Sequence, residues 1–190
     1  MISKTKDRQT EADNITAFIL AGYDTLSPGA FPKGLLRSQG RSYIENISDK
    51  LKTITSEIKI SANTNDYNHL ALPVYTDLVS GLGPLGGIYT ALTVSSTSRN
   101  LLVACDIPMV SSEFLKQLTM YNEYDLVLPQ VNDKLYPLCA CYNISSLNKI
   151  NHLIKRGESR LNSLVNILNC KVVKADSLNL FGGGDYLISA

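Results

Sequence analysis

Ile15-Thr16-Ala17-Phe18-Ile19-Leu20-Ala21-Gly22 is the stretch of sequence that decides the fold. Its first six residues form a short apolar run, which predicts a buried strand. The small residue and the glycine that follow would let backbone N–H groups approach a phosphate with no side chain in the way. Lys33 follows within reach of such a phosphate, after a segment shaped by Pro28, Gly29 and Pro32. Taken alone, an ordinary strand-to-loop turn explains Ala21-Gly22 better than a phosphate site does.

Apolar runs that predict strands alternate along the chain with segments of helical periodicity. The predicted strands are residues 15–20, 58–61, 72–75, 101–105, 125–129 and 136–142. Apolar side chains recur at spacings of three and four within residues 44–54, 114–121, 147–154 and 161–168, and Ser111 or Ser112 is suited to cap the second of these helices. This alternation predicts a three-layer α/β/α sandwich, Rossmann-like, with a mostly parallel sheet. Ligands of such sheets bind beyond the carboxyl ends of the strands.

Length and composition indicate one ordinary globular domain. The chain has 190 residues, 44% hydrophobic and 18% charged, with a net charge of +1, so neither a nucleic-acid surface nor a membrane span is predicted. We expect residues 1–13 to form a flexible leader, residues 14–178 the domain, and residues 179–190 a glycine-containing tail. The polar N-terminal segment lacks the apolar core of a secretory signal, which favours a cytoplasmic protein.

The cysteines do not suggest a metal site. Cys105, Cys139, Cys141 and Cys170 show no C-x-x-C spacing and have no histidine nearby. We expect buried free thiols in strands.

An aspartate ends one of the predicted strands. Asp106 follows the apolar run 101–105 and precedes Ile107-Pro108, which fixes a turn. A carboxylate in this place is suited to hold Mg²⁺ against a triphosphate. The alternative is an aspartate that only caps a turn, which is common. The apolar run before it and the proline after it favour the metal ligand.

Three further segments place polar or glycine residues at the same edge of the predicted sheet. Asn63 and Asp77 each follow a predicted strand, and their side chains could accept hydrogen bonds from the ring N–H and amino groups of a base such as guanine. Each alone is more often a turn residue. Residues 81–87 hold four glycines and open a predicted helix, which allows close backbone approach to a flat or anionic ligand. The alternative is a flexible connection between strand and helix, but four glycines in seven residues are more than such a connection usually needs.

Read in order, these segments resemble the molybdenum cofactor guanylyltransferase family, which is related to the sugar-nucleotide pyrophosphorylases. The resemblance covers roughly residues 15–170. The matching segments are Ile19-Leu20-Ala21-Gly22, Lys33-Gly34-Leu35-Leu36, Gly40-Arg41-Ser42-Tyr43-Ile44-Glu45, Ile60-Ser61-Ala62-Asn63, Pro73-Val74-Tyr75-Thr76-Asp77, Gly83-Pro84-Leu85-Gly86-Gly87, Cys105-Asp106-Ile107-Pro108 and Pro137-Leu138-Cys139-Ala140.

The resemblance implies a GT-A-like nucleotidyltransferase fold and a reaction with GTP. GMP would pass from GTP to the molybdenum-bearing molybdopterin cofactor with Mg²⁺, giving the guanine dinucleotide cofactor and pyrophosphate. It implies that Lys33 and Asp106 are catalytic and that Asp106 binds the metal. It further implies that the nucleotide is bound by Leu20, Ala21, Gly22, Lys33, Asn63, Asp77 and Asp106. GTP and the molybdopterin cofactor would be the ligands, and other proteins of the cofactor pathway are candidate partners.

The segment between Gly22 and Lys33 departs from the family pattern, approximately L-A-G-G-x-S-x-R-M-G-x-x-K. Tyr23 replaces the second glycine, Ser27 the arginine and Pro28 the methionine, while Pro32 precedes the lysine. The C-terminal Asn-x-Asn-Thr-Pro stretch is also missing. Asp185 could substitute for it as a polar contact, but a flexible glycine-rich tail explains residues 180–186 better. Two alternatives therefore remain open: a catalytically impaired relative that binds nucleotide or cofactor, and a nucleotidyltransferase that uses CTP or a sugar phosphate.

Overall fold

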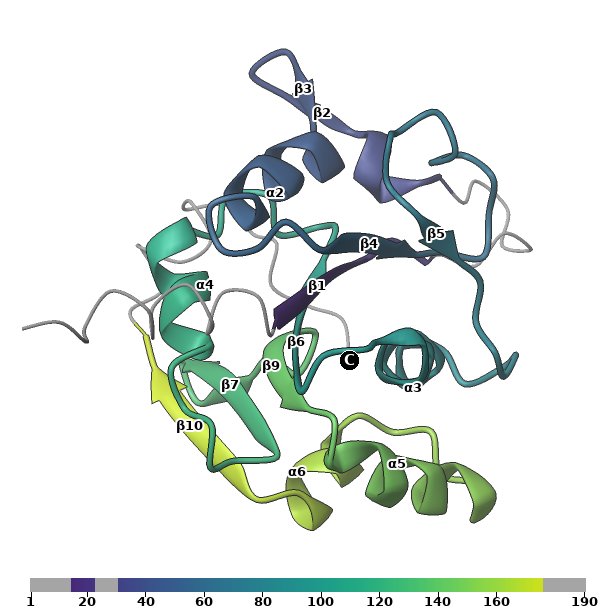
Figure 1. The fold of residues 1–190 in the computed structure, drawn as a ribbon, viewed down its shortest axis with the longest axis vertical. Coiled ribbons are helices and arrows are strands. Elements are labelled where there is room, and N and C mark those ends of the chain that lie inside the picture. Colours follow the sequence, from purple (N-terminus) through teal and green to yellow (C-terminus); the bar gives the residue numbers. More distant parts are fainter. Residues whose placement is uncertain (1–14, 23–30, 176–190) are drawn as a thin grey trace, which may run out of the picture.

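A mixed sheet runs through the part of the chain that the structure describes, residues 15–22 and 31–175 of a computed structural model (Figure 1). Its eight described strands follow the order β10-β7-β9-β6-β1-β4-β5, with β8 paired to β7. These strands are β1 (Ile15–Leu20), β4 (Ile58–Ser61), β5 (Val74–Tyr75), β6 (Arg99–Ala104), β7 (Leu126–Val131), β8 (Lys134–Leu135), β9 (Cys139–Asn143) and β10 (Cys170–Lys174).

The sheet is mostly parallel, as the sequence predicts. β1 pairs in parallel with β4 and β6, β4 with β5, and β7 with β10. Two strands run the other way: β9 lies antiparallel between β6 and β7, and the short β8 pairs antiparallel with β7. The parallel run β6-β1-β4-β5 brings the carboxyl ends of four strands to one edge.

Helices cover both faces of the sheet and complete the three layers (Figure 1). The helices are α2 (Tyr43–Leu51), α3 (Pro84–Val94), α4 (Ser112–Leu118), α5 (Ser146–Lys155) and α6 (Asn162–Ile167). α2 and α4 share a core cluster with Ile19 of β1, whereas α3, α5 and α6 share the other cluster with Phe18. Because neighbouring side chains of a strand point to opposite faces, a central strand buried on both sides reads as a continuous apolar run. The α/β/α prediction is therefore confirmed.

Local chemistry explains where α2 and α4 begin. Ser42 precedes α2 and forms a capping box, in which its Oγ accepts from Glu45 N while its own N–H donates to Glu45 Oε2 at 2.8 Å. Of the two serines expected to cap α4, Ser111 is the N-cap, and its Oγ accepts from Phe114 N at 3.1 Å.

Several strand boundaries differ from the predicted ones. β9 begins at Cys139 and not at residue 136, because Cys139 N donates to Tyr136 O in a turn and Pro137 has no N–H to offer. β8 and β10 were not predicted, nor was the hairpin of β2 (Arg37–Ser38) and β3 (Arg41–Ser42). The predicted leader and tail lie outside the described residues. None of the helices in residues 31–175 is long and apolar enough to cross a membrane.

Candidate functional site

The four loops expected to carry polar residues meet at one edge of the sheet. Backbone hydrogen bonds continue past the strand ends: Ala21 N donates to Ser61 O, and Cys105 N to Leu20 O, both at 2.9 Å. Ala62 N likewise donates to Tyr75 O at 2.9 Å. The segments after β1, β4, β5 and β6 therefore leave the sheet side by side, where α/β proteins bind their ligands.

Lys33 and Asp106 face each other at this edge although 73 positions separate them in the chain. The Lys33 Nζ lies 3.3 Å from Asp106 Oδ2, and the two side chains are 56% and 40% exposed. An ion pair this exposed contributes little to stability. Both groups are accessible, so the ammonium could turn to a phosphate and the carboxylate to a cation.

A buried tyrosine supports the short helix that begins at Lys33. This element, η1 (Lys33–Leu35), contains the buried Gly34, and a Cβ placed there would lie 3.0 Å from Cε1 and Oη of Tyr67. Tyr67 is fully buried in the loop after β4, the same loop that begins with Asn63. The packing of Tyr67 against Gly34 thus connects the segment of Lys33 to the loop of Asn63. Sequence reasoning missed Tyr67, because nothing in its local pattern distinguishes it from an ordinary loop residue.

The thiol next to Asp106 is not a reactive group. Burial raises the pKa of Cys105 to about 12, and the negative charge of Asp106 adds to the effect. A thiol with so high a pKa is not a nucleophile at neutral pH. The other cysteines are free; Cys139 and Cys141 are buried in β9, and Cys170 is partly buried in β10. The accessible side chain of this segment is the carboxylate of Asp106.

Asn63 and Asp77 are hydrogen-bonded to each other. Asn63 Nδ2 donates to Asp77 Oδ2, and Asp77 N donates to Asn63 Oδ1, both at 2.8 Å. The two bonds fix the orientation of the carboxylate. Burial raises the pKa of Asp77, while the hydrogen bond from Asn63 works to lower it. The pair can act as an oriented acceptor for N–H groups of a ligand.

The glycine-rich segment brings α3 close to Asp77. A Cβ on Gly86 would lie 3.0 Å from Asp77 Oδ2 and 3.2 Å from Val79 O. A Cβ on Gly87 would lie 3.3 Å from Ser61 Oγ and 3.6 Å from Leu20 Cδ2. Gly83, the N-cap of α3, has a φ of 54°, a conformation that glycine adopts without strain. The glycines thus allow the first turn of α3 to pack directly on the ends of β1 and β4.

The remaining predicted residues differ in exposure. The Leu20 side chain packs toward α3, and Ala21 is buried. Gly22 is exposed, and a Cβ there would meet nothing within 4 Å. Pro32 is the N-cap of η1. Tyr23, Ser27, Pro28 and Asp185 lie outside the described residues.

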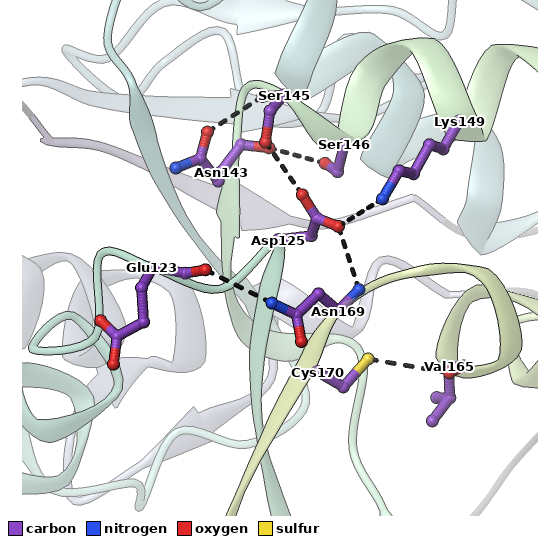
Figure 2. Close-up of polar contacts among 9 residues, drawn as sticks. All are labelled: Glu123, Asp125, Asn143, Ser145, Ser146, Lys149, Val165, Asn169 and Cys170. Carbon is purple, nitrogen blue, oxygen red and sulfur yellow. Dashed lines mark hydrogen bonds and ion pairs between the residues drawn. The ribbon is translucent and has the colours of Figure 1, made fainter.

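A second polar cluster surrounds Asp125, at the end of the sheet where the parallel strands β7 and β10 begin (Figure 2). Asp125 precedes β7 and accepts hydrogen bonds from Lys149 Nζ at 2.7 Å, Asn169 N at 3.0 Å and Ser145 Oγ at 3.0 Å. Its carboxylate is thus satisfied by the protein itself. Within residues 15–22 and 31–175, no group of three or more His, Cys, Asp or Glu side chains could hold a metal by itself.

Comparison with known proteins places this geometry in a family. Residues 17–172 match the model of the MobA-like NTP transferase domain. A Flavobacterium johnsoniae protein named "Probable molybdenum cofactor guanylyltransferase" is 35% identical over 155 residues, covering 80% of this chain and 81% of the relative. A Yersinia pestis protein named "Molybdenum cofactor guanylyltransferase" is 30% identical, covering 85% of both chains.

A solved structure agrees at the level of the fold. The molybdopterin-guanine dinucleotide biosynthesis protein A from Archaeoglobus fulgidus superposes with a TM-score of 0.69, covering 84% of this chain and 83% of that one, at 21% identity. The family match spans the whole run of strands from β1 into β10, including the four strand ends that carry the predicted site residues. The chain therefore belongs to the MobA-like NTP transferase family.

Proposed function

We propose that this protein transfers GMP from GTP to the molybdenum-bearing molybdopterin cofactor, giving the guanine dinucleotide cofactor and pyrophosphate. The observation that carries the proposal is the Lys33–Asp106 pair at the carboxyl edge of the sheet. It places an accessible cation and an accessible carboxylate together in a chain that is 30–37% identical to proteins bearing the guanylyltransferase name.

The reaction is a substitution at the α-phosphorus of GTP. A phosphate oxygen of the pterin forms the new P–O bond, and the bond from the α-phosphorus to the bridging oxygen breaks, so that pyrophosphate leaves with the electron pair. Because both reactants are anionic, the protein needs to position them and neutralise their charge, and no covalent nucleophile is needed. Lys33 Nζ would contact the phosphates, and the backbone at Gly22 leaves room for their approach.

Asp106 is the residue that fits Mg²⁺. Mg²⁺ is commonly bound by one or two carboxylates together with substrate phosphates and water, so a single accessible carboxylate beside a phosphate-binding lysine satisfies the protein's share. When bound, the ion would supply further neutralisation of phosphate charge. Lys33 pairs with this carboxylate and would turn toward the phosphates when they bind.

Asp77 would recognise the guanine, with Asn63 holding the carboxylate in place. Guanine offers a ring N–H and an amino group side by side, which suits an oriented carboxylate acceptor. Cytosine lacks this pair of adjacent donors in neutral form. Preference for GTP over CTP would therefore depend on an ionised Asp77.

The departures at Tyr23, Ser27, Pro28 and Pro32 support a second candidate, a relative that binds GTP without efficient turnover. An arginine that neutralises transition-state charge can contribute orders of magnitude in rate, and Ser27 cannot replace it. Restoring that arginine with Ser27→Arg is expected to raise the rate if the loop has lost only this group.

The test is transfer of label from GTP carrying ³²P at the α-phosphate, with Mg²⁺ and molybdenum-loaded pterin. Label in the dinucleotide product supports the transferase, and Asp106→Asn should lower kcat/KM by about 100-fold or more. Asp133→Asn makes the same change in the exposed turn between β7 and β8 and should leave kcat/KM unchanged. GTP binding without transfer would favour the second candidate, and a preference for CTP would contradict both.

A further inference from the structure

The loop that carries Asp106 shares a hydrophobic core cluster with α2. Ile107 and Val110 follow the aspartate and are buried in the same core cluster as Ile47 and Leu51 of α2. The loop returns to regular structure at the N-cap Ser111. Apolar packing therefore fixes where the loop lies, but packing alone is not directional and does not set its rotation.

One directional contact adds to this packing. Lys50, in the last turn of α2, donates a hydrogen bond from Nζ to the backbone carbonyl of Pro108. Pro108 is buried and lies two residues after Asp106, and Lys50 is half-buried. A charged donor to a carbonyl forms one of the stronger hydrogen bonds in proteins, and a buried carbonyl is costly to leave unpaired. Lys50 is thus a fixed support for the loop.

The neighbouring lysine differs in each of these respects. Lys52 is exposed and pairs with Asp49 on the surface of the same helix end, with Nζ 3.1 Å from Oδ1. Arg41 also pairs with Asp49. Lys52 and Arg41 thus form surface ion pairs with Asp49, whereas Lys50 makes a part-buried hydrogen bond to the loop.

A support of this kind matters because Asp106 is the carboxylate to which the proposed function assigns the cation. A metal held by one side chain and by substrate phosphates depends on the direction in which that carboxylate points. Residues behind metal ligands that fix their orientation commonly change metal affinity by 10- to 100-fold when they are replaced.

We propose that Lys50 is a positioning residue for the metal-binding carboxylate of Asp106, acting through the Pro108 carbonyl. The inference rests on the proposed function, in which Asp106 holds Mg²⁺. It assigns to α2 a role beyond covering the sheet: the helix sets the orientation of the loop that binds the cation.

The experiment measures GTP affinity by calorimetry with Mg²⁺ and in excess chelator, without the pterin, so that no turnover occurs. The ratio of the two affinities is the metal coupling, and Asp106→Asn gives its baseline. Lys50→Met removes the donor but keeps most of the stem, and we expect about a tenfold smaller coupling with chelator affinity unchanged. Lys50→Arg keeps a donor and should retain the coupling, as should the matched control Lys52→Met.

A purely structural role for Lys50 would lower both affinities together or only the unfolding temperature, which is measured alongside, and either result would overturn the inference. Lys50→Gln, which keeps an amide donor on a shorter stem, gives a milder second variant for which a smaller drop in coupling is expected. Equal coupling in the wild type and in Lys50→Met overturns the inference alone. Absence of any coupling in the wild type would contradict the metal role of Asp106 and the inference with it.

Discussion

At the scale of single residues, Asp77 shows how the site balances two opposing effects. Burial favours the neutral acid and raises the pKa of Asp77, whereas the hydrogen bond from Asn63 Nδ2 favours the carboxylate. The net result is a carboxylate that protonates more readily than an exposed one. Under the proposed function the neutral form accepts fewer hydrogen bonds from guanine, so GTP affinity should fall on the acid side.

Replacing Asn63 tests this balance. Asn63→Ala removes the contact that favours the carboxylate, so the pKa of Asp77 should rise further and the acid loss of GTP affinity should move to higher pH. At neutral pH the loss of orientation should cost several-fold in affinity, on the order of 1 kcal/mol. Titration of a fluorescent GTP analogue between pH 5 and pH 8 measures both effects.

Asn65→Ala is the matched control, since Asn65 lies on the same loop and bonds locally to Asn68. Its pH profile should coincide with that of the wild type. A profile for Asn63→Ala that does not move, with reduced affinity at every pH, would show that Asn63 contacts the nucleotide without affecting the ionisation of Asp77.

The sequence indicated the separate residues of the candidate site but not how they pair. Asp106, Asn63 and Asp77 each follow an apolar run, a local signal that is visible in one dimension. The ion pair of Lys33 with Asp106 joins positions 73 apart, and the Lys50 contact with Pro108 joins positions 58 apart. No local periodicity specifies such contacts, because they depend on which strand lies beside which.

At the scale of elements, α2 connects the hairpin, the core and the Asp106 loop. Its first turn is fixed by the capping box of Ser42 and Glu45, whose side chains are also 2.6 Å apart. The hydrogen bonds from Ser42 lower the pKa of Glu45. Since a depressed carboxyl pKa stabilises the fold only while the group is ionised, this contribution is lost as the pH falls through that pKa.

Removing the cap should destabilise the whole domain modestly. Ser42→Ala leaves the N–H of Glu45 without its acceptor, and the free energy of unfolding should fall by about 1 kcal/mol. For a chain of this size the melting temperature should fall by about 2–4 °C. Thermal unfolding followed by circular dichroism measures the change.

Ser38→Ala is the control, because it removes a serine of the same hairpin, in strand β2, that does not cap a helix. It should change the free energy of unfolding by no more than about 0.5 kcal/mol. A Ser42→Ala variant as stable as Ser38→Ala would mean that tertiary packing holds the helix start without the cap.

The strands most accurately predicted lie in the centre of the sheet, where buried apolar residues mark them in the sequence. β1, β4 and β6 match their predicted positions to within two residues. β2, β3 and β8 are two residues each, too short for any period to emerge. Their turns use positive φ at Gln39 and Gly40 and at Asn132 and Asp133. β10 carries lysines at positions 171 and 174, as suits the edge of a sheet, and these interrupt its apolar pattern.

At the scale of the whole molecule, the sheet separates two polar clusters with different functions. The strand ends at β1, β4, β5 and β6 carry the accessible pair of Lys33 and Asp106. The opposite edge carries Asp125, whose side chain is only 14% exposed and whose acceptors are filled by Ser145, Lys149 and Asn169 (Figure 2). The second cluster joins the start of β7 to α5 and to the start of β10, so its hydrogen bonds stabilise the fold.

Asp125 should therefore determine part of the acid sensitivity of the fold. Burial works to raise the pKa of Asp125, but the hydrogen bonds from Lys149, Asn169 and Ser145 together outweigh it and leave the pKa below its usual value. A depressed pKa means that the contribution is present above the unfolded value, about pH 4, and is lost as the pH falls through the folded one. At pH 7, Asp125→Asn should lower the free energy of unfolding by about 1–3 kcal/mol.

Urea unfolding between pH 2.5 and pH 7 measures this contribution. The difference in the free energy of unfolding between the wild type and Asp125→Asn should narrow steadily below about pH 4. Protonation of Asp125 in the wild type removes the same ionised carboxylate that the substitution has already removed. Asp133→Asn makes the same chemical change in an exposed turn and should follow the wild type. GTP affinity of Asp125→Asn should be unchanged at neutral pH, since the two clusters lie at opposite edges of the sheet. A stability difference that stays constant down to pH 2.5 would mean that the substitution acts through side-chain shape and not through charge. A fall in the GTP affinity of Asp125→Asn would show that the Asp125 cluster and the candidate site are energetically coupled.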